Sequence, residues 1–167
     1  MPLVVRTVAG AIVIALAVAA ATDRAAAQAA PFSYTGTLDF VDPAGATDLG
    51  LAFGDAFTVM ALLDPSLLGG FGQETIALDV PGHSFDLAIG NGALMFDETA
   101  DSAFGSGFPQ ALFEDGLLAG FDFVTDPLSV SGSLYQVNLL EDELEITSGL
   151  LANPSVVVTG SLAMSPD

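Results

Sequence analysis

The sequence has no cysteine, no tryptophan and a single histidine, and only two of its 167 residues are lysine or arginine. Both are arginines, Arg6 and Arg24, so the chain from Gln28 onward has no lysine or arginine at all. That part of the chain therefore contains no salt bridge formed by a lysine or an arginine of its own. Without cysteine, the fold has to be stabilised by its core rather than by disulfides, and lipid attachment through a lipobox-type cysteine is excluded.

These absences also exclude several classes of function. Because no lysine or arginine occurs from Gln28 onward, nucleic acid and anionic membrane surfaces are poor partners for that part of the chain. With one histidine and no cysteine, it cannot build a usual zinc site. Glycoside hydrolysis needs paired carboxylates, and so acidic a chain contains such pairs by chance. Sugar sites also tend to use aromatic platforms, but this chain has no tryptophan and only two tyrosines, Tyr34 and Tyr135. Glycoside hydrolysis is therefore not expected.

The single histidine, His83, lies in the turn Pro81-Gly82-His83-Ser84. A triad of His83 with Ser84 and Asp86 is unfavourable, because neighbouring residues in a strand point to opposite faces. The chain also has no Gly-x-Ser-x-Gly nucleophile elbow. We therefore expect His83 to be an exposed turn histidine, and we expect that the protein is not an enzyme.

The chain is strongly acidic, with 21 aspartate and glutamate residues and a formal net charge of −19. Like charges repel one another in the compact state, and salt, with a Debye length of about 10 Å at 0.1 M, screens that repulsion. Disorder is not expected, because hydrophobic residues make up 51% of the chain and 12 residues are phenylalanine, whereas disordered segments are poor in both.

Residues 1–29 have the three-part pattern of a secretory signal peptide. Arg6 supplies positive charge, 8–21 is an unbroken apolar run, and small residues follow at 25–30. The run is shorter than the roughly 20 residues that a spanning helix needs, so a cleaved signal is favoured over a retained anchor. We expect cleavage after Ala27 or Ala29, one acidic β-sandwich domain over residues 30–167, no later membrane contact, and a secreted protein, either extracellular or periplasmic.

After the leader, apolar and polar residues alternate at period two, which is typical of half-buried strands. Aspartate-proline pairs at Asp42, Asp64 and Asp126 end three of these segments, and Asn91-Gly92 is the strongest hairpin signal. The expected strands are 32–41, 56–63, 75–80, 84–89, 93–96, 108–113, 117–124, 130–140, 144–147 and 156–163, with loops at 45–50, 66–72 and 97–107.

About nine or ten short strands separated by turns predict an all-β fold, either a single jelly-roll-like β-sandwich or a closed barrel. The first and last strands carry similar cores, Thr-Gly-Thr-Leu and Thr-Gly-Ser-Leu. Left free, both would be exposed edges, which natural sheets avoid. We therefore predict that these two strands pair, antiparallel, with Gly36 and Gly160 at a bulge or a close backbone approach.

Calcium is the one cofactor for which the sequence offers suitable ligands, because it prefers hard oxygen donors. None of the acidic segments matches the EF-hand loop pattern. The alternative is that these acids are solvated and keep an exported protein dispersed. The candidate metal ligands are Asp97, Glu98 and Asp101 in one loop and Glu141, Asp142 and Glu143 in another, with Glu114, Asp115 and Glu145 as further acidic positions.

Three segments carry a resemblance to a known family: FSYTGTLDFVDP, AFTVMALLDPS and VVVTGSLA. They resemble the extracellular β-domains of bacterial exosortase-sorted proteins of the PEP-CTERM kind, in which a signal peptide precedes a Gly- and Thr-rich β-domain. The sequence ends at Ser165-Pro166-Asp167, without that family's Pro-Glu-Pro-like motif, apolar helix and basic tail. The resemblance implies an exported envelope or matrix protein, of a kind that usually has no known catalytic activity.

The sequence as a whole favours a non-enzymatic structural or interaction protein of the bacterial cell envelope or extracellular matrix. Its expected partners are cell-surface or matrix components, met through the acidic surface, and nucleic acid is not among them. The alternative is a calcium-dependent binding or adhesion module. A melting curve with calcium, with EDTA and with magnesium at equal ionic strength separates the two hypotheses.

Overall fold

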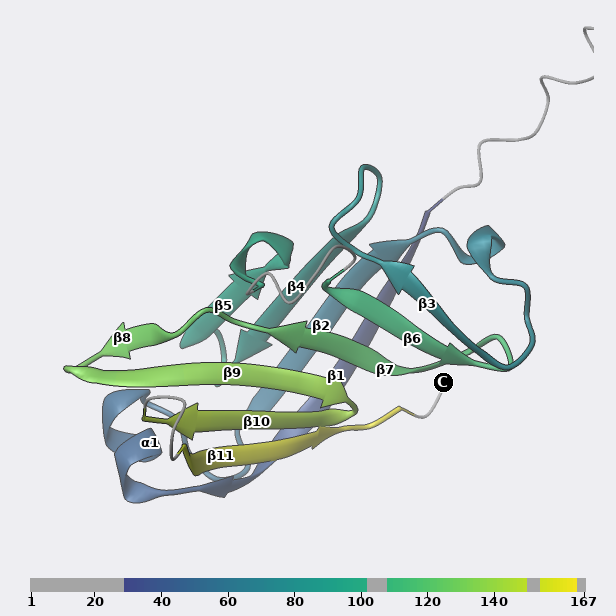
Figure 1. Cartoon of the computed structure of the whole chain (residues 1–167). Helices are drawn as coiled ribbons and strands as arrows, with labels where there is room; N and C mark the ends of the chain where they lie inside the picture. The colour runs from purple at the N-terminus through teal and green to yellow at the C-terminus, as the bar shows by residue number, and fades with distance from the viewer. Residues whose placement is uncertain (1–28, 102–107, 150–153, 165–167) are drawn as a thin grey trace, which may run out of the picture.

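The computed structural model describes residues 29–101, 108–149 and 154–164, and they are mostly β-structure (Figure 1). The all-β prediction is therefore confirmed. Helical structure in the described residues is limited to α1 (Pro43–Asp48) and the 3₁₀ turns η2 (Pro65–Leu67) and η3 (Glu98–Ala100). The strands are β1 (Ala30–Val41), β2 (Ala56–Leu63), β3 (Gln73–Ala77), β4 (Ser84–Ile89), β5 (Leu94–Asp97), β6 (Gln110–Glu114), β7 (Leu117–Val124), β8 (Leu128–Val130), β9 (Ser133–Glu141), β10 (Glu143–Ser148) and β11 (Ser155–Leu162).

Within the described residues the strands form one curled antiparallel sheet, ordered β3-β6-β7-β9-β10-β11-β1-β2-β4-β5, with β8 paired to β9 beside this path. In Figure 1, β1, β2 and β4 lie behind the layer of β6, β7 and β9. The sheet is a half-barrel, which differs from the predicted two-sheet sandwich and from a closed barrel. Its edges in the described residues are β3 and β5.

The predicted pairing of the first and last strands is confirmed. β1 runs antiparallel to β11, with Gly36 opposite Leu162 and Leu38 opposite Gly160. The close backbone approach is also confirmed, because a Cβ atom on Gly36 would lie 2.3 Å from the carbonyl oxygen of Ser161. The pair lies in the interior of the sheet and joins its two halves. The outer edges of the sheet are therefore formed by other strands, β3 and β5.

The core lies between the two halves of the curled sheet. Phe85 on β4 packs against Phe123 and Phe121 on β7, with ring centroids 4.7 and 5.9 Å away. Phe96 on β5 approaches Phe123 at 6.1 Å, and Tyr34 on β1 approaches Phe121 at 6.3 Å. Because β4 and β5 are far from β7 in the strand order, these contacts form only if the sheet curls.

Turn chemistry correctly located two of the hairpins. Asn91 and Gly92 have φ of 54° and 86° between β4 and β5, and Asp115 and Gly116 have φ of 50° and 80° between β6 and β7. Such left-handed pairs match the twist of antiparallel strands. The predicted strand 130–140 was wrong in one respect, because a turn of the same kind at 131–132 divides it into β8 and β9.

The predicted loop at 45–50 was also partly wrong, since α1 covers 43–48. The side chain of Asp42 accepts a hydrogen bond from the backbone N–H of Gly45 at 2.6 Å, and Pro43 occupies the first turn. Both features favour the start of a helix. The aspartate-proline pair that ends the first strand therefore also begins a helix.

Among the helices of the described segments, none is long and apolar enough to cross a membrane.

His83 is half-buried rather than exposed, which corrects the prediction. Its Nε2 accepts a hydrogen bond from the N–H of Asp64 at 3.3 Å, and its Nδ1 donates to the carbonyl oxygen of Ala77 at 2.7 Å. Ala77 belongs to the edge strand β3, and Asp64 directly follows β2. The ring therefore connects the two halves of the curled sheet near an edge.

Replacing His83 by alanine should lower the free energy of unfolding by about 1–2 kcal/mol, because two part-buried backbone groups lose their partners. Val80→Ala serves as the control, since Val80 lies in the same turn and is 40% exposed. Urea unfolding monitored by circular dichroism measures both. Equal midpoints for the two variants would show that the ring does not hold the sheet halves together.

Candidate functional site

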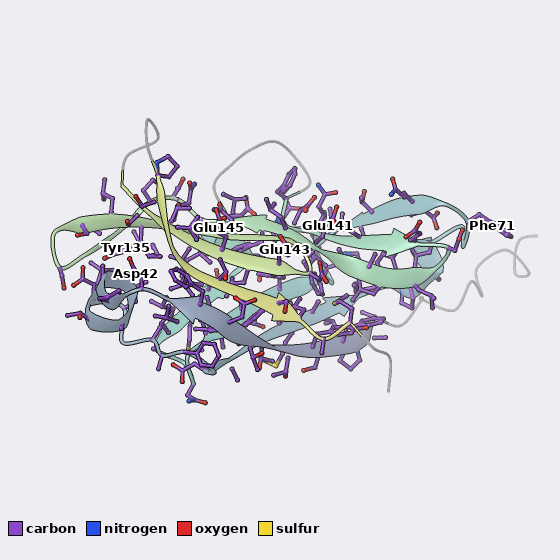
Figure 2. The ribbon with its side chains drawn as sticks, turned by 90° about the horizontal axis from the view of Figure 1, so that it is seen from below. Asp42, Phe71, Tyr135, Glu141, Glu143 and Glu145 are labelled. Carbon is purple, nitrogen blue, oxygen red and sulfur yellow. The ribbon has the colours of Figure 1, made fainter. Side chains whose placement is uncertain are left out.

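The acidic run at 141–143 forms the tight turn between β9 and β10. Glu141 has a φ of 60°. Asp142 is half-buried, and Glu143 is exposed at the start of β10, opposite Ser161 of β11. Figure 2 shows Glu141, Glu143 and Glu145 at separate points along this hairpin. The turn thus spreads these carboxylates over the sheet surface.

The other candidate ligands lie at the end of β5 and are occupied by local hydrogen bonds. Asp97 caps η3 by accepting from the N–H of Thr99 at 3.0 Å and from its hydroxyl at 2.6 Å. Glu98 accepts from the N–H of Phe85, and Asp101 accepts from the backbone on β7. In the three described ranges no group of three or more His, Asp or Glu side chains is arranged to hold a metal ion. Calcium binding stays a prediction.

Like charges face one another on the outer side of the sheet. Asp86 on β4 lies directly opposite Asp97 on β5. Desolvation, followed by the charges of Glu98 and Asp97, raises the pKa of Asp86. Desolvation also raises the pKa of Asp101 and Asp122, whereas hydrogen bonds from Thr99 lower the pKa of Asp97. The folded state therefore carries several carboxylates that are costly to ionise.

An apolar groove of about 300 Å³ lies where β1 begins and the β6–β7 hairpin turns. It is formed by side chains from both ends of the domain sequence and from the segments around η2 and the β6–β7 turn. Exposed apolar surface of this kind marks interaction sites when it is contiguous. The side chains that define the apolar groove include Phe32, Tyr34, Leu68, Leu117, Leu118 and Met164.

Phe71 projects from the loop between η2 and β3, and 88% of its surface is exposed. Figure 2 shows it at one extremity of the molecule. Leu67 and Leu117 are 63% and 68% exposed. The Phe71 loop adjoins the apolar groove, because a Cβ on Gly116 of the groove would lie 3.5 Å from the Cα of Gly70. Phe71 and the apolar groove therefore occupy the same end.

The loop is fixed in place by hydrogen bonds on both sides of Phe71. The backbone N–H groups of Gly69 and Gly70 donate to the two carboxylate oxygens of Glu74 at 2.7 and 2.9 Å. The residue after Phe71 donates its N–H to Oδ1 of Asp115 at 2.8 Å and accepts the N–H of Asp115 at 2.9 Å. The backbone on both sides of Phe71 is held in this way, so that contact with a partner costs little ordering of the loop.

Tyr135 and Asp42 lie at the opposite end of the molecule from Phe71 (Figure 2). Tyr135 is buried on β9 and donates its hydroxyl hydrogen to Oδ2 of Asp48 in α1 at 2.6 Å. The bond to this carboxylate is the first cause that raises the pKa of Tyr135. Together with the cap from Asp42, this bond attaches α1 to the sheet.

Residues 66–72 were predicted as a loop, and Phe71 was not among the predicted functional residues. The available signal was a phenylalanine enclosed by glycines, Gly69-Gly70-Phe71-Gly72, where no strand or helix can bury it.

No family model matches this chain, and no curated protein or solved structure matches it either. The functional interpretation therefore depends on the residues and the geometry described above.

Proposed function

We propose that this protein is an exported, non-enzymatic interaction protein of the bacterial cell envelope or extracellular matrix. In this proposal it docks a partner at the end that carries Phe71 and the apolar groove. The observation that carries the proposal is the presentation of Phe71, which is 88% exposed yet held by hydrogen bonds from both sides of its loop. Phe71 has the largest exposed fraction among the exposed large hydrophobic side chains of the described residues.

Two further observations support this function. Aromatic side chains surrounded by a hydrophobic patch are typical of the residues that dominate binding energy at interfaces. His83, which the triad hypothesis would need, has both ring nitrogens bonded to the backbone. Export rests on the signal-peptide pattern, and the envelope or matrix location rests on the resemblance in the strand segments.

The proposal predicts that the exported protein, added back to washed producing cells, is retained, and that Phe71→Ser reduces retention at least about tenfold, as loss of a central aromatic contact does. Phe53→Ser is the matched control, because Phe53 is 76% exposed but lies in the loop before β2. Labelled protein bound per cell is the measurement. Equal retention of wild type and Phe71→Ser, or equal loss in both variants, would contradict docking at this end.

A further inference from the structure

Carboxylates surround the apolar groove on the partner-facing end. Asp64 precedes the groove residue Pro65, and Asp115 precedes the groove residue Gly116. Glu74 holds the Phe71 loop. From Gln28 onward the chain has no lysine or arginine to neutralise these charges. A partner that covers the apolar groove therefore enters a negative potential, which favours cationic groups and disfavours anionic ones.

A second hollow, lined by residues of β3, β6, β7 and β9, places carboxylates close to the apolar groove. It has a volume of about 240 Å³ and is lined by three carboxylate residues, Glu74, Glu114 and Glu141. Phe113 lines both this hollow and the apolar groove. We call it the acidic hollow. The three carboxylates are not arranged to hold a metal ion, but a long, flexible lysine or arginine side chain can reach such a hollow while its stem covers apolar surface.

The same charges argue against a second copy of the chain as the occupant. Two copies meeting at this end would oppose their acidic hollows, with a formal net charge of −19 on each full chain. Like charges juxtaposed across an interface cost several kcal/mol. Phe71 could enter the apolar groove of a second copy only against that repulsion.

We propose, on the basis of the proposed function, that the partner is a cationic protein segment in which an apolar side chain is flanked by lysine or arginine. The apolar side chain packs in the apolar groove and against Phe71, whose loop adjoins that groove. A flanking cation lies in the acidic hollow, beyond Phe113. Electrostatic attraction speeds the encounter, and burial of the apolar anchor retains it.

The test is a selection of random peptides displayed on phage against the full exported chain, with counter-selection on Phe71→Ser. Enriched peptides are then synthesised, and their affinities are measured by fluorescence anisotropy in low and in molar salt. The third protein is the double variant Glu114→Gln with Glu141→Gln. It alters the acidic hollow but leaves Glu74 and Asp115, and thus the loop hydrogen bonds, unchanged.

The enriched peptides should combine lysine or arginine with an apolar residue. Their affinity should fall at least about tenfold for Phe71→Ser and about threefold to tenfold for the double glutamine variant, with further weakening in molar salt. Enrichment of neutral or acidic apolar peptides that need Phe71 overturns the cationic class and leaves the proposed function standing. Enrichment that does not depend on Phe71 overturns both. A dimer in light scattering that Phe71→Ser abolishes identifies a second copy as the occupant and overturns the cationic partner.

Discussion

Gly36→Val is expected to abolish the cooperative unfolding transition of the domain or to lower its free energy of unfolding by about 4 kcal/mol or more, in the range that marks an exceptional substitution. A Cβ at position 36 would lie 2.3 Å from the carbonyl oxygen of Ser161 and 2.4 Å from two ring atoms of Phe57. The first neighbour is backbone and the second is a fully buried ring. Moving the first separates β1 from β11, and moving the second displaces a core side chain of β2.

The size of the effect follows from where the β1–β11 pair lies. Strands β10, β11, β1 and β2 are consecutive in the sheet, so separating β1 from β11 divides the sheet into two halves. A domain of this size is stable by only about 5–15 kcal/mol, and neither half retains the facing core surface. A clash at this position is therefore expected to propagate to the whole fold.

Thr35→Val is the matched control, because Thr35 is the preceding residue of β1 and lies on the exposed face opposite Thr58. This exposed change should alter the free energy of unfolding by about 0.5 kcal/mol or less. Guanidinium unfolding followed by circular dichroism compares the two variants. If Gly36→Val unfolds with the midpoint of Thr35→Val, the close approach at Gly36 does not constrain the sheet.

The parts of this fold that the sequence predicted are those in which a few adjacent residues decide the structure. Asn91-Gly92 and Asp115-Gly116 specify their turns because both residues of each pair adopt left-handed backbone angles. The β1–β11 pairing was predictable for another reason, since two strands with the same Thr-Gly core present the same small residue at the point of closest approach. The two turns need no knowledge of the rest of the chain, and the strand pairing needs only a comparison of its first and last strands.

The parts that were missed depend on contacts between distant positions. His83 is half-buried because Asp64, 19 residues away, donates to its ring. The Phe71 loop is fixed by Asp115, 43 residues from its bonding partner in the loop. The choice between a sandwich, a barrel and a half-barrel depends on which strands become edges, and the alternation of apolar and polar residues is the same in all three.

The second large effect concerns charge. Raising sodium chloride from low to molar concentration should increase the melting temperature by roughly 5 °C or more, the shift that about 1–2 kcal/mol of relieved repulsion gives in a domain of this size. The reason is that like charges such as Asp86 and Asp97 are placed opposite one another, and no lysine or arginine from Gln28 onward offsets them. Differential scanning calorimetry is the measurement. Magnesium and calcium at equal ionic strength are the controls, and a larger shift with calcium alone would indicate a specific site rather than screening.

Mild acidification tests the same repulsion without adding salt. The pKa values of Asp86, Asp101 and Asp122 are raised above the ordinary 3.8, so near and above that pH the folded state binds more protons than the unfolded state. Stability then rises as the pH falls through the folded pKa values and is lost as the pH rises through them. Asp97, whose pKa is lowered by Thr99, opposes the trend as one group against three. The melting temperature should therefore increase as the pH falls from neutral toward the acidic pKa range, whereas proteins that depend on carboxylate salt bridges lose stability there. A steady decrease over that range, together with a melting temperature that salt does not change, would show that repulsion between carboxylates does not limit the stability of this fold.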